Sequence, residues 1–125
     1  MTNAYLDDDQ ELVEIPALSR KLNGIINLPG DAKGIVLFAH GSGSSRFSSR
    51  NQYVARELQQ AGLATLLFDL LDEQEATDRS KVFDINLLAE RLKTAAAWVK
   101  QAEDLSSLRL GYFGASTGAA AALVA

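Results

Sequence analysis

The sequence contains no cysteine, only one histidine and only two prolines among its 125 residues. The absence of cysteine excludes disulfides and thiolate metal sites, and it is compatible with a reducing compartment. Because the remaining carboxylates are scattered along the chain and show no ligand spacing, we expect no metal ion and no cofactor. No uninterrupted apolar stretch approaches the roughly 18 residues needed to span a membrane.

An excess of positive charge is also missing. Lysine and arginine number 12 against 16 aspartate and glutamate residues, which gives a formal net charge of -4 at pH 7. Nucleic-acid binding calls for a basic patch, so this balance argues against nucleic acid as a partner. The segment Met1–Asp7 lacks the basic start and apolar centre of a signal peptide. We therefore expect a cytoplasmic protein that acts on a small-molecule substrate without a membrane partner, its oligomeric state left open.

The composition provides enough apolar material for a core, with 47% hydrophobic and 22% charged residues. Two acidic clusters, Asp7–Asp9 and Asp72–Glu75, are interpreted as solvated surface. We expect residues 1–10 to form a flexible N-terminus and residues 11–125 to belong to a single α/β domain.

Four segments have the patterns of strands before the last quarter of the chain. Glu11–Ile15, which Pro16 is expected to end, and Leu22–Leu28 alternate polar and apolar residues, and their short connection predicts an antiparallel pair. Gly34–Ala39 and Leu63–Phe68 are almost continuously apolar, which predicts central strands buried on both faces.

Two helices are predicted, one between the two central strands and one after the second of them. Ser49–Ala61 is followed by Gly62 as a stop signal, and Asp84 is a good N-cap for a helix that continues to about Val99. The intervening segment Leu70–Val82 is predicted to be a charged loop. Strands and helices alternate after the opening pair, which favours a mostly parallel sheet with helices on both faces.

A predicted strand, Leu108–Phe113, leads into a glycine-bounded turn with Ser116 at its tip, and a run of small helix formers follows. This G-x-S-x-G pattern is typical of a nucleophile elbow, in which the tight turn exposes a serine for activation by a base. The positions two before and two after the serine are crowded, and Gly114 and Gly118 occupy them. We predict Ser116 as the nucleophile and the backbone N–H of Thr117, at the start of the helix, as an oxyanion donor.

The loop after the first central strand begins His40-Gly41-Ser42-Gly43. In hydrolases with this elbow the second oxyanion donor comes from this loop, and we predict the N–H of Ser42 for it. Gly41 and Gly43 let the backbone turn toward the substrate. We expect His40 to brace the loop by hydrogen bonding. The alternative role of catalytic base is disfavoured because the usual order is serine, acid, histidine.

Arg46 is a candidate contact for a substrate carboxylate or phosphate, with a solvated position at the start of a helix as the alternative. Residues Gly41–Arg46 also raise a second hypothesis, a non-catalytic ligand- or phosphate-binding module. The third glycine of a dinucleotide fingerprint and the ending of a P-loop are both missing from this loop, which weakens that hypothesis. Asp69, at the end of a central strand, is expected to be structural rather than the acid of a triad.

Three segments together resemble the dienelactone hydrolase-like branch of the α/β-hydrolase superfamily: Phe38–Arg46, Leu67–Leu71 and Gly111–Gly118. The resemblance covers residues 10–125 in order and spacing. It is strongest to bacterial proteins of that branch, some of which are fused to a phosphoribosyltransferase-like domain, so such a fusion or neighbour is expected among relatives. It implies an eight-stranded α/β-hydrolase fold and a Ser-acid-His triad, with Ser116 as nucleophile and Ser42 and Thr117 as oxyanion donors.

The chain departs from that family in two ways. Dienelactone hydrolases proper have cysteine as the nucleophile, so lactone specificity does not carry over to Ser116. The family's acid and histidine follow later strands that this sequence does not include, a difference of about 90 residues at roughly 30 per βα unit. We expect the chain to be the N-terminal portion of a longer hydrolase, truncated after the elbow and nearly inactive alone, that cleaves an ester, thioester or lactone through an acyl-enzyme.

Overall fold

The computed structural model describes residues 10–41, 44–114 and 116–125. The predicted flexible N-terminus lies outside these residues except for Gln10, with which the first strand begins. The described elements, in chain order, are β1 (Gln10–Ala17), β2 (Arg20–Asn27), β3 (Gly34–Ala39), α1 (Ser49–Gln60), β4 (Ala64–Phe68), the 3-10 helix η1 (Glu75–Thr77), α2 (Arg79–Val82), α3 (Ile85–Gln101), β5 (Arg109–Gly114) and α4 (Thr117–Val124).

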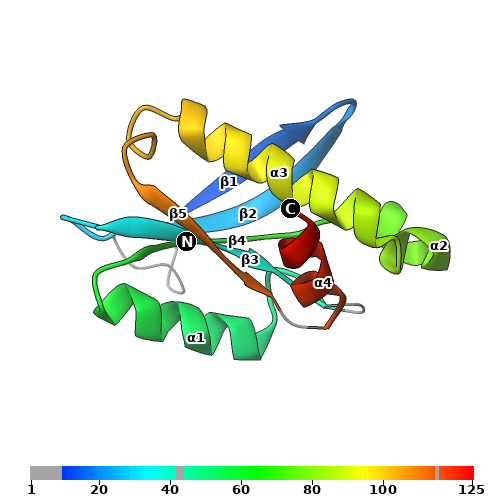
Figure 1. Cartoon of the computed structure of the whole chain (residues 1–125), viewed down its shortest axis with the longest axis horizontal. Coiled ribbons are helices and arrows are strands. Elements are labelled where there is room, and N and C mark those ends of the chain that lie inside the picture. Colours follow the sequence, from blue (N-terminus) through cyan, green and yellow to red (C-terminus); the bar gives the residue numbers. More distant parts are fainter. Residues whose placement is uncertain (1–9, 42–43, 115) are drawn as a thin grey trace, which may run out of the picture.

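The strands form one five-stranded sheet in the order β1-β2-β4-β3-β5 (Figure 1). β3 pairs in parallel with β4 and with β5, as the alternation of strands and helices predicts. β1 and β2 form the predicted antiparallel pair. β2 also pairs antiparallel with β4, so the antiparallel pair adjoins the parallel strands at β4 and the described sheet is mixed.

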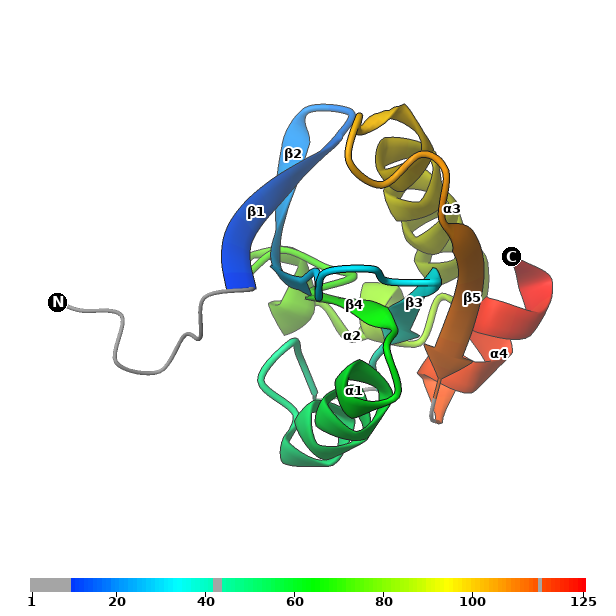
Figure 2. The ribbon, with the colours of Figure 1, turned by 90° about the vertical axis from the view of Figure 1, so that its left-hand side faces the viewer.

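Helices cover both faces of the sheet, which confirms the predicted layers. α1 lies on one face, and α3 and α4 lie on the other (Figure 2). The larger part of the core lies on the side of α3, whose buried residues recur at helical spacing: Leu88, Ala89, Leu92, Ala95 and Val99. Asp84 caps this helix as predicted, because its carboxylate accepts a hydrogen bond from the N–H of Leu87 at 3.1 Å.

The first strand does not end at Pro16, as the sequence suggested, but continues to Ala17. β1 is an edge strand of the described sheet. Proline has no backbone N–H, and it is tolerated on an edge strand because the outward-facing N–H groups there have no neighbouring strand to bond. Pro16 lies opposite Lys21, close to the turn that joins the two strands.

The segment from Leu70 to Val82 is also more ordered than predicted, since it contains both η1 and α2. The N–H of Ser80 donates to the carboxylate of Asp78 at 3.0 Å, which caps the short helix α2. This segment lies between the end of β4 and the start of α3, so it forms one wall beside the carboxyl ends of the central strands.

The parallel strands bring three distant parts of the sequence to one edge of the sheet. β3, β4 and β5 run in the same direction, with Phe38 opposite Leu67 and Ala39 opposite Gly114. The residues that follow these strands therefore meet at their carboxyl ends, where ligands bind in open α/β sheets. Among the described helices, none has both the length and the apolar character needed to cross a membrane.

Candidate active site

The predicted elbow is a sharp turn between a strand and a helix. β5 ends at Gly114 and α4 begins at Thr117. Ser116, between them, is exposed and has φ 59° and ψ -129°. A non-glycine residue in a sparsely populated backbone region costs about 1–3 kcal/mol, and it persists only where the surrounding structure imposes it. An exposed serine on a strained strand-to-helix turn is the geometry of a nucleophile elbow.

Two glycines allow the backbone to pass very closely at this turn. A Cβ atom on Gly114 would lie 2.5 Å from the carbonyl oxygen of Gly118. A Cβ atom on Gly118 would overlap the carbonyl oxygens of Ala39 and His40. Gly118 thus sets the first turn of α4 directly against the end of β3, which joins the elbow to the loop that follows β3.

Thr117 is the first residue of α4, and the first N–H groups of a helix have no partner within the helix. The carbonyl of Ser116 accepts the first bond of the helix, from the N–H of Ala119 at 3.0 Å. The N–H of Thr117 therefore lies at the positive end of the helix dipole, next to the serine. The Oγ1 atom of Thr117 is buried and has no hydrogen-bond partner among the described residues.

His40 is held between two loops by its ring nitrogens. The N–H of Leu70 donates to Nε2 at 2.9 Å, so Nε2 carries no proton in this arrangement. Nδ1 then carries the proton and donates it to the carbonyl of Gly41 at 3.0 Å. Both nitrogens of the buried ring are occupied by backbone groups, and the ring links the loop after β3 to the loop after β4.

The loop after β3 is described on both sides of Ser42 and Gly43, which themselves lie outside the described residues. Their predicted parts in the oxyanion hole and in shaping the loop stay predictions. The carbonyl of Gly41 also accepts a hydrogen bond from the N–H of Ser44 at 3.1 Å.

Arg46 is bound within the protein rather than free at the start of α1. Its backbone N–H donates to one carboxylate oxygen of Asp69 at 2.7 Å, and its guanidinium pairs with the other. The guanidinium also lies 4.2 Å from the centre of the Phe47 ring. Asp69, predicted to be structural, ties the loop after β3 to the end of β4.

A buried ion-pair cluster lies behind the loop after β4, where the sequence suggested solvated surface. Glu75 is only 2% exposed, and both of its carboxylate oxygens bind Arg91 of α3, at 2.8 and 2.6 Å. Arg20 reaches Glu75 at 3.3 Å and Asp72 at 2.5 Å. The hydrogen bonds from Arg91 hold the pKa of the Glu75 carboxyl below its ordinary value. The interpretation of Asp72–Glu75 as solvated surface is wrong for Asp72 and Glu75, whose charges have internal partners, whereas Glu73 is exposed as predicted.

One local signal in the sequence marks this cluster. Asp72 and Glu75 have the spacing of a capping box, in which two side chains bind each other's backbone N–H. The N–H of Glu75 donates to Asp72 at 2.8 Å, and the N–H of Asp72 donates to Glu75 at 3.2 Å. No sequence spacing indicates Arg91, which is 16 residues away from Glu75.

Arg91 connects the cluster to the candidate site through the backbone of Leu70. Its guanidinium donates to the carbonyl of Leu70 at 3.2 Å, and the N–H of the same residue donates to His40. The start of the loop after β4 is therefore held from α3 on one side and from the loop after β3 on the other.

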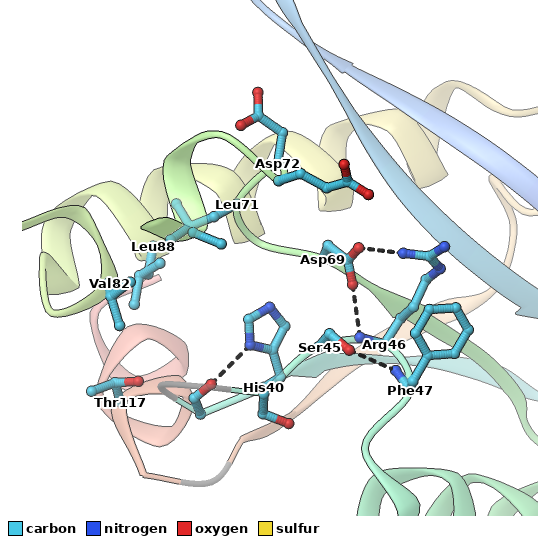
Figure 3. Close-up of a pocket in the computed structure, with 14 residues that line it drawn as sticks. His40, Ser45, Arg46, Phe47, Asp69, Leu71, Asp72, Val82, Leu88 and Thr117 are labelled. Atoms are coloured by element: carbon cyan, nitrogen blue, oxygen red, sulfur yellow. Dashed lines mark hydrogen bonds and ion pairs between the residues drawn. The ribbon is translucent and has the colours of Figure 1, made fainter. Parts of the chain in front are cut away.

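A pocket of about 420 Å³ opens between these loops and the start of α4. Figure 3 shows Leu71, Val82 and Leu88 grouped on one side of the His40 ring, and Asp69, which binds Arg46, on the other. Thr117 contributes to the lining, so the pocket reaches the elbow. Its volume suits a small molecule.

A second hollow, of about 740 Å³, is larger but lies over β1, β2 and β4 beside α1, and its lining includes neither the elbow nor His40. We therefore place the candidate site in the smaller pocket. Within the described residues no group of three or more histidine, aspartate or glutamate side chains is arranged to hold a metal ion.

Comparison with known proteins shows which solved and curated proteins this chain is similar to. No family model matches the chain. The dienelactone hydrolase of Anabaena variabilis ATCC 29413 is 54% identical and superposes with a TM-score of 0.89 over 92% of this chain and 55% of that chain. The fold is that of the α/β-hydrolases, in its dienelactone hydrolase-like form. The resemblance predicted from three sequence segments is confirmed.

More distant α/β-hydrolases have the same fold. The Pyrococcus furiosus esterase Pf2001 is 25% identical with a TM-score of 0.75, and the match covers 92% of this chain and 45% of that one. An α/β serine hydrolase homologue from Coxiella burnetii is 22% identical with a TM-score of 0.74, over 91% of this chain and 56% of that one. This second likeness is one of fold alone.

Two curated relatives carry a different name. In two strains of Mycobacterium tuberculosis, CDC 1551 / Oshkosh and ATCC 25618 / H37Rv, a protein named "Putative phosphoribosyl transferase" is 55% identical over 115 residues. The match covers 92% of this chain but only 26% of those proteins. The chain thus spans about a quarter of the curated relatives and about half of the dienelactone hydrolase.

Proposed function

We propose that this chain carries the nucleophile and oxyanion donors of a serine hydrolase that cleaves a carboxylic ester, thioester or lactone through an acyl-enzyme. The observation that carries the proposal is the exposed, strained Ser116 between Gly114 and Gly118 at the start of α4. It occurs in a chain 54% identical to a solved dienelactone hydrolase.

In the proposed reaction the Oγ atom of Ser116 attacks the carbonyl carbon of the substrate while a base accepts the hydroxyl proton. The negative charge that develops on the carbonyl oxygen is stabilised by the N–H groups of Thr117 and Ser42. The alcohol or thiol leaves with a proton and the acyl group stays on Ser116. Water then cleaves the acyl-enzyme, releases the acid and restores the serine.

The base is proposed to come from a later part of the full-length protein, as a histidine positioned by an acid. His40 is a poor candidate because its unprotonated nitrogen, Nε2, accepts the N–H of Leu70 and has no lone pair left for the serine proton. Residues 1–125 produced alone should therefore react only slowly at Ser116.

A fluorophosphonate probe tests the proposal, because it phosphonylates activated serines. The full-length protein should be labelled at Ser116, as located by mass spectrometry of peptides. Ser116→Ala should abolish labelling and lower kcat for p-nitrophenyl esters by about 10⁴-fold or more. Ser107→Ala, which removes an exposed serine before β5, is the matched control and should label normally. An unlabelled full-length protein, or a label on another serine, contradicts the proposal.

The alternative is a non-catalytic module that binds a phosphate group with the loop Gly41–Arg46, to which the name of the Mycobacterium proteins lends some support. Against it, the guanidinium of Arg46 is already paired with Asp69. We propose instead that the transferase name describes another part of those longer proteins. Calorimetric titration with ribose 5-phosphate distinguishes the two, since only the module should bind it.

A further inference from the structure

The pocket beside the elbow has one apolar wall, built by side chains from three parts of the chain. Leu71 follows β4, Val82 belongs to α2, and Leu88 lies in the first turn of α3. Leu71 and Leu88 are buried in the core, so this wall is supported from behind. Such a wall favours an apolar group of the substrate over a hydrated one.

The opposite wall is charged, and its charge is negative. Among the described residues, the lining contains three carboxylates and one cationic side chain, Arg46. That guanidinium is paired with Asp69, so its charge is compensated inside the wall. Asp72 has an ion-pair partner in Arg20, which lies behind the wall and does not line the pocket. The carboxylate of Glu73 is exposed at the rim.

A substrate carboxylate in this pocket would meet like charge and lose water without gaining a free cation. Like charges within a partly desolvated site repel more strongly than in bulk water, because the effective dielectric constant is lower. An anionic acyl group is therefore penalised, while an uncharged apolar one gains from contact with Leu71, Val82 and Leu88.

We infer that the enzyme selects an uncharged, apolar acyl group and discriminates against acyl groups that end in a carboxylate. This inference rests on the proposed function, because it assigns the acyl specificity of the same site. It replaces the sequence-based idea that Arg46 binds a substrate anion: Arg46 neutralises Asp69, and Glu73 gives the rim its uncompensated charge.

Two p-nitrophenyl esters of equal chain length test this specificity in the full-length protein. p-Nitrophenyl hexanoate has an uncharged acyl group, and mono-p-nitrophenyl adipate ends in a carboxylate, while the leaving group is the same. We expect kcat/KM for the hexanoate to exceed that for the adipate by about tenfold or more at low ionic strength.

Two variants test the origin of the preference. Asp69→Asn removes a carboxylate and releases the guanidinium of Arg46, so the adipate-to-hexanoate ratio of kcat/KM should rise by about tenfold. Glu73→Lys should raise the same ratio without disturbing the Arg46 contact. The matched control is Glu103→Lys, an exposed residue beyond the end of α3, which changes net charge equally and should leave the ratio unchanged.

The outcomes separate this inference from the proposed function. Hydrolysis of the adipate at a rate equal to or above that of the hexanoate overturns the inference while the proposed function stands. Equal effects of Glu73→Lys and Glu103→Lys overturn the assignment of the preference to the pocket. Cleavage of neither ester, together with no fluorophosphonate label, overturns the proposed function and this inference with it.

Discussion

The strained backbone of Ser116 depends on residues that carry no Cβ atom. Gly114 and Gly118 lie so close that their backbones touch, and Gly118 also meets the carbonyl oxygens at the end of β3. These contacts involve backbone atoms, which cannot rotate away as a side chain can. The position of Ser116 is therefore determined by close packing of main-chain atoms.

A methyl group at position 118 tests this packing. Gly118→Ala should lower the free energy of unfolding by about 3 kcal/mol, because the added carbon overlaps the carbonyl oxygens of Ala39 and His40. Urea unfolding of the full-length protein measures it. Gly111→Ala is the matched control, since a Cβ atom there meets no atom within 4 Å. Equal stability of the two variants would contradict this account of the turn.

Substitution of His40 separates bracing from proton transfer. His40→Ala leaves the buried N–H of Leu70 without an acceptor and should lower the free energy of unfolding by about 1–3 kcal/mol. Labelling of Ser116 by fluorophosphonate should persist in the folded variant. His40→Gln, whose amide oxygen is able to accept a hydrogen bond, should recover part of the stability. Loss of labelling in a folded His40→Ala protein would instead identify His40 as the base.

At the scale of elements, the strands and long helices follow from local patterns. The continuous apolar runs of β3 and β4, and the residues of α3 that recur every three or four positions, are visible in the sequence because burial repeats with the period of the element. The elbow is also visible in the sequence, because the crowding around Ser116 is local and requires glycine two positions before it, at Gly114, and two positions after it, at Gly118.

The segment between β4 and α3 was mispredicted because its interactions are not local. Glu75 looks solvated beside Asp72 and Glu73, yet its partners Arg91 and Arg20 belong to α3 and β2. A charged residue is buried only where such partners converge, and sequence spacing does not reveal which distant cations do so. The pairing of Arg46 with Asp69 was missed for the same reason.

The ion-pair cluster should make stability depend on acid pH. The pKa of the Glu75 carboxyl is lowered, chiefly by its hydrogen bonds from Arg91, so the folded state favours the ionised form. Its contribution is present above the ordinary glutamate value of about 4.3 and is lost as pH falls through the lower, folded-state value. The pKa of the Asp72 carboxyl is also lowered, chiefly because this carboxylate accepts a hydrogen bond from the backbone N–H of Glu75.

Glu75→Gln tests this contribution. At pH 7 the variant should be about 3 kcal/mol less stable, because Arg91 keeps its buried charge without a counter-ion. The difference from the unsubstituted protein should shrink as pH falls below about 4. Urea unfolding between pH 3 and pH 7 measures both, with the exposed Glu57→Gln of α1 as the control. A difference that does not change with pH would exclude ionisation of Glu75 as the cause.

At the scale of the whole molecule, β5 forms one edge of the described sheet, and most of its residues are only partly buried. The matched part makes up 55% of the solved dienelactone hydrolase, so that protein is considerably longer than the part it shares with this chain. An unpaired strand edge is a template for pairing with another chain. On α4, next to this edge, Leu123 is 89% exposed.

Residues 1–125 produced alone should therefore self-associate, whereas the full-length protein should not do so through this face. Sedimentation velocity at increasing concentration measures the effect. Leu123→Lys should weaken the association, and Leu18→Lys, at a still more exposed leucine in the turn between β1 and β2, should not. A monodisperse monomer of residues 1–125 at all concentrations would contradict the prediction.

The contact between Gly118 and the end of β3 has a consequence for how this scaffold diversifies. The turn that carries the serine is positioned by main-chain atoms, whereas the pocket is lined by side chains such as Leu71, Glu73 and Val82. Mutations that remodel the lining leave the frame of the turn intact. Selection is thus able to change the shape and charge of the lining in few steps while the turn is kept, so a single ancestral scaffold is able to acquire different ligand specificities.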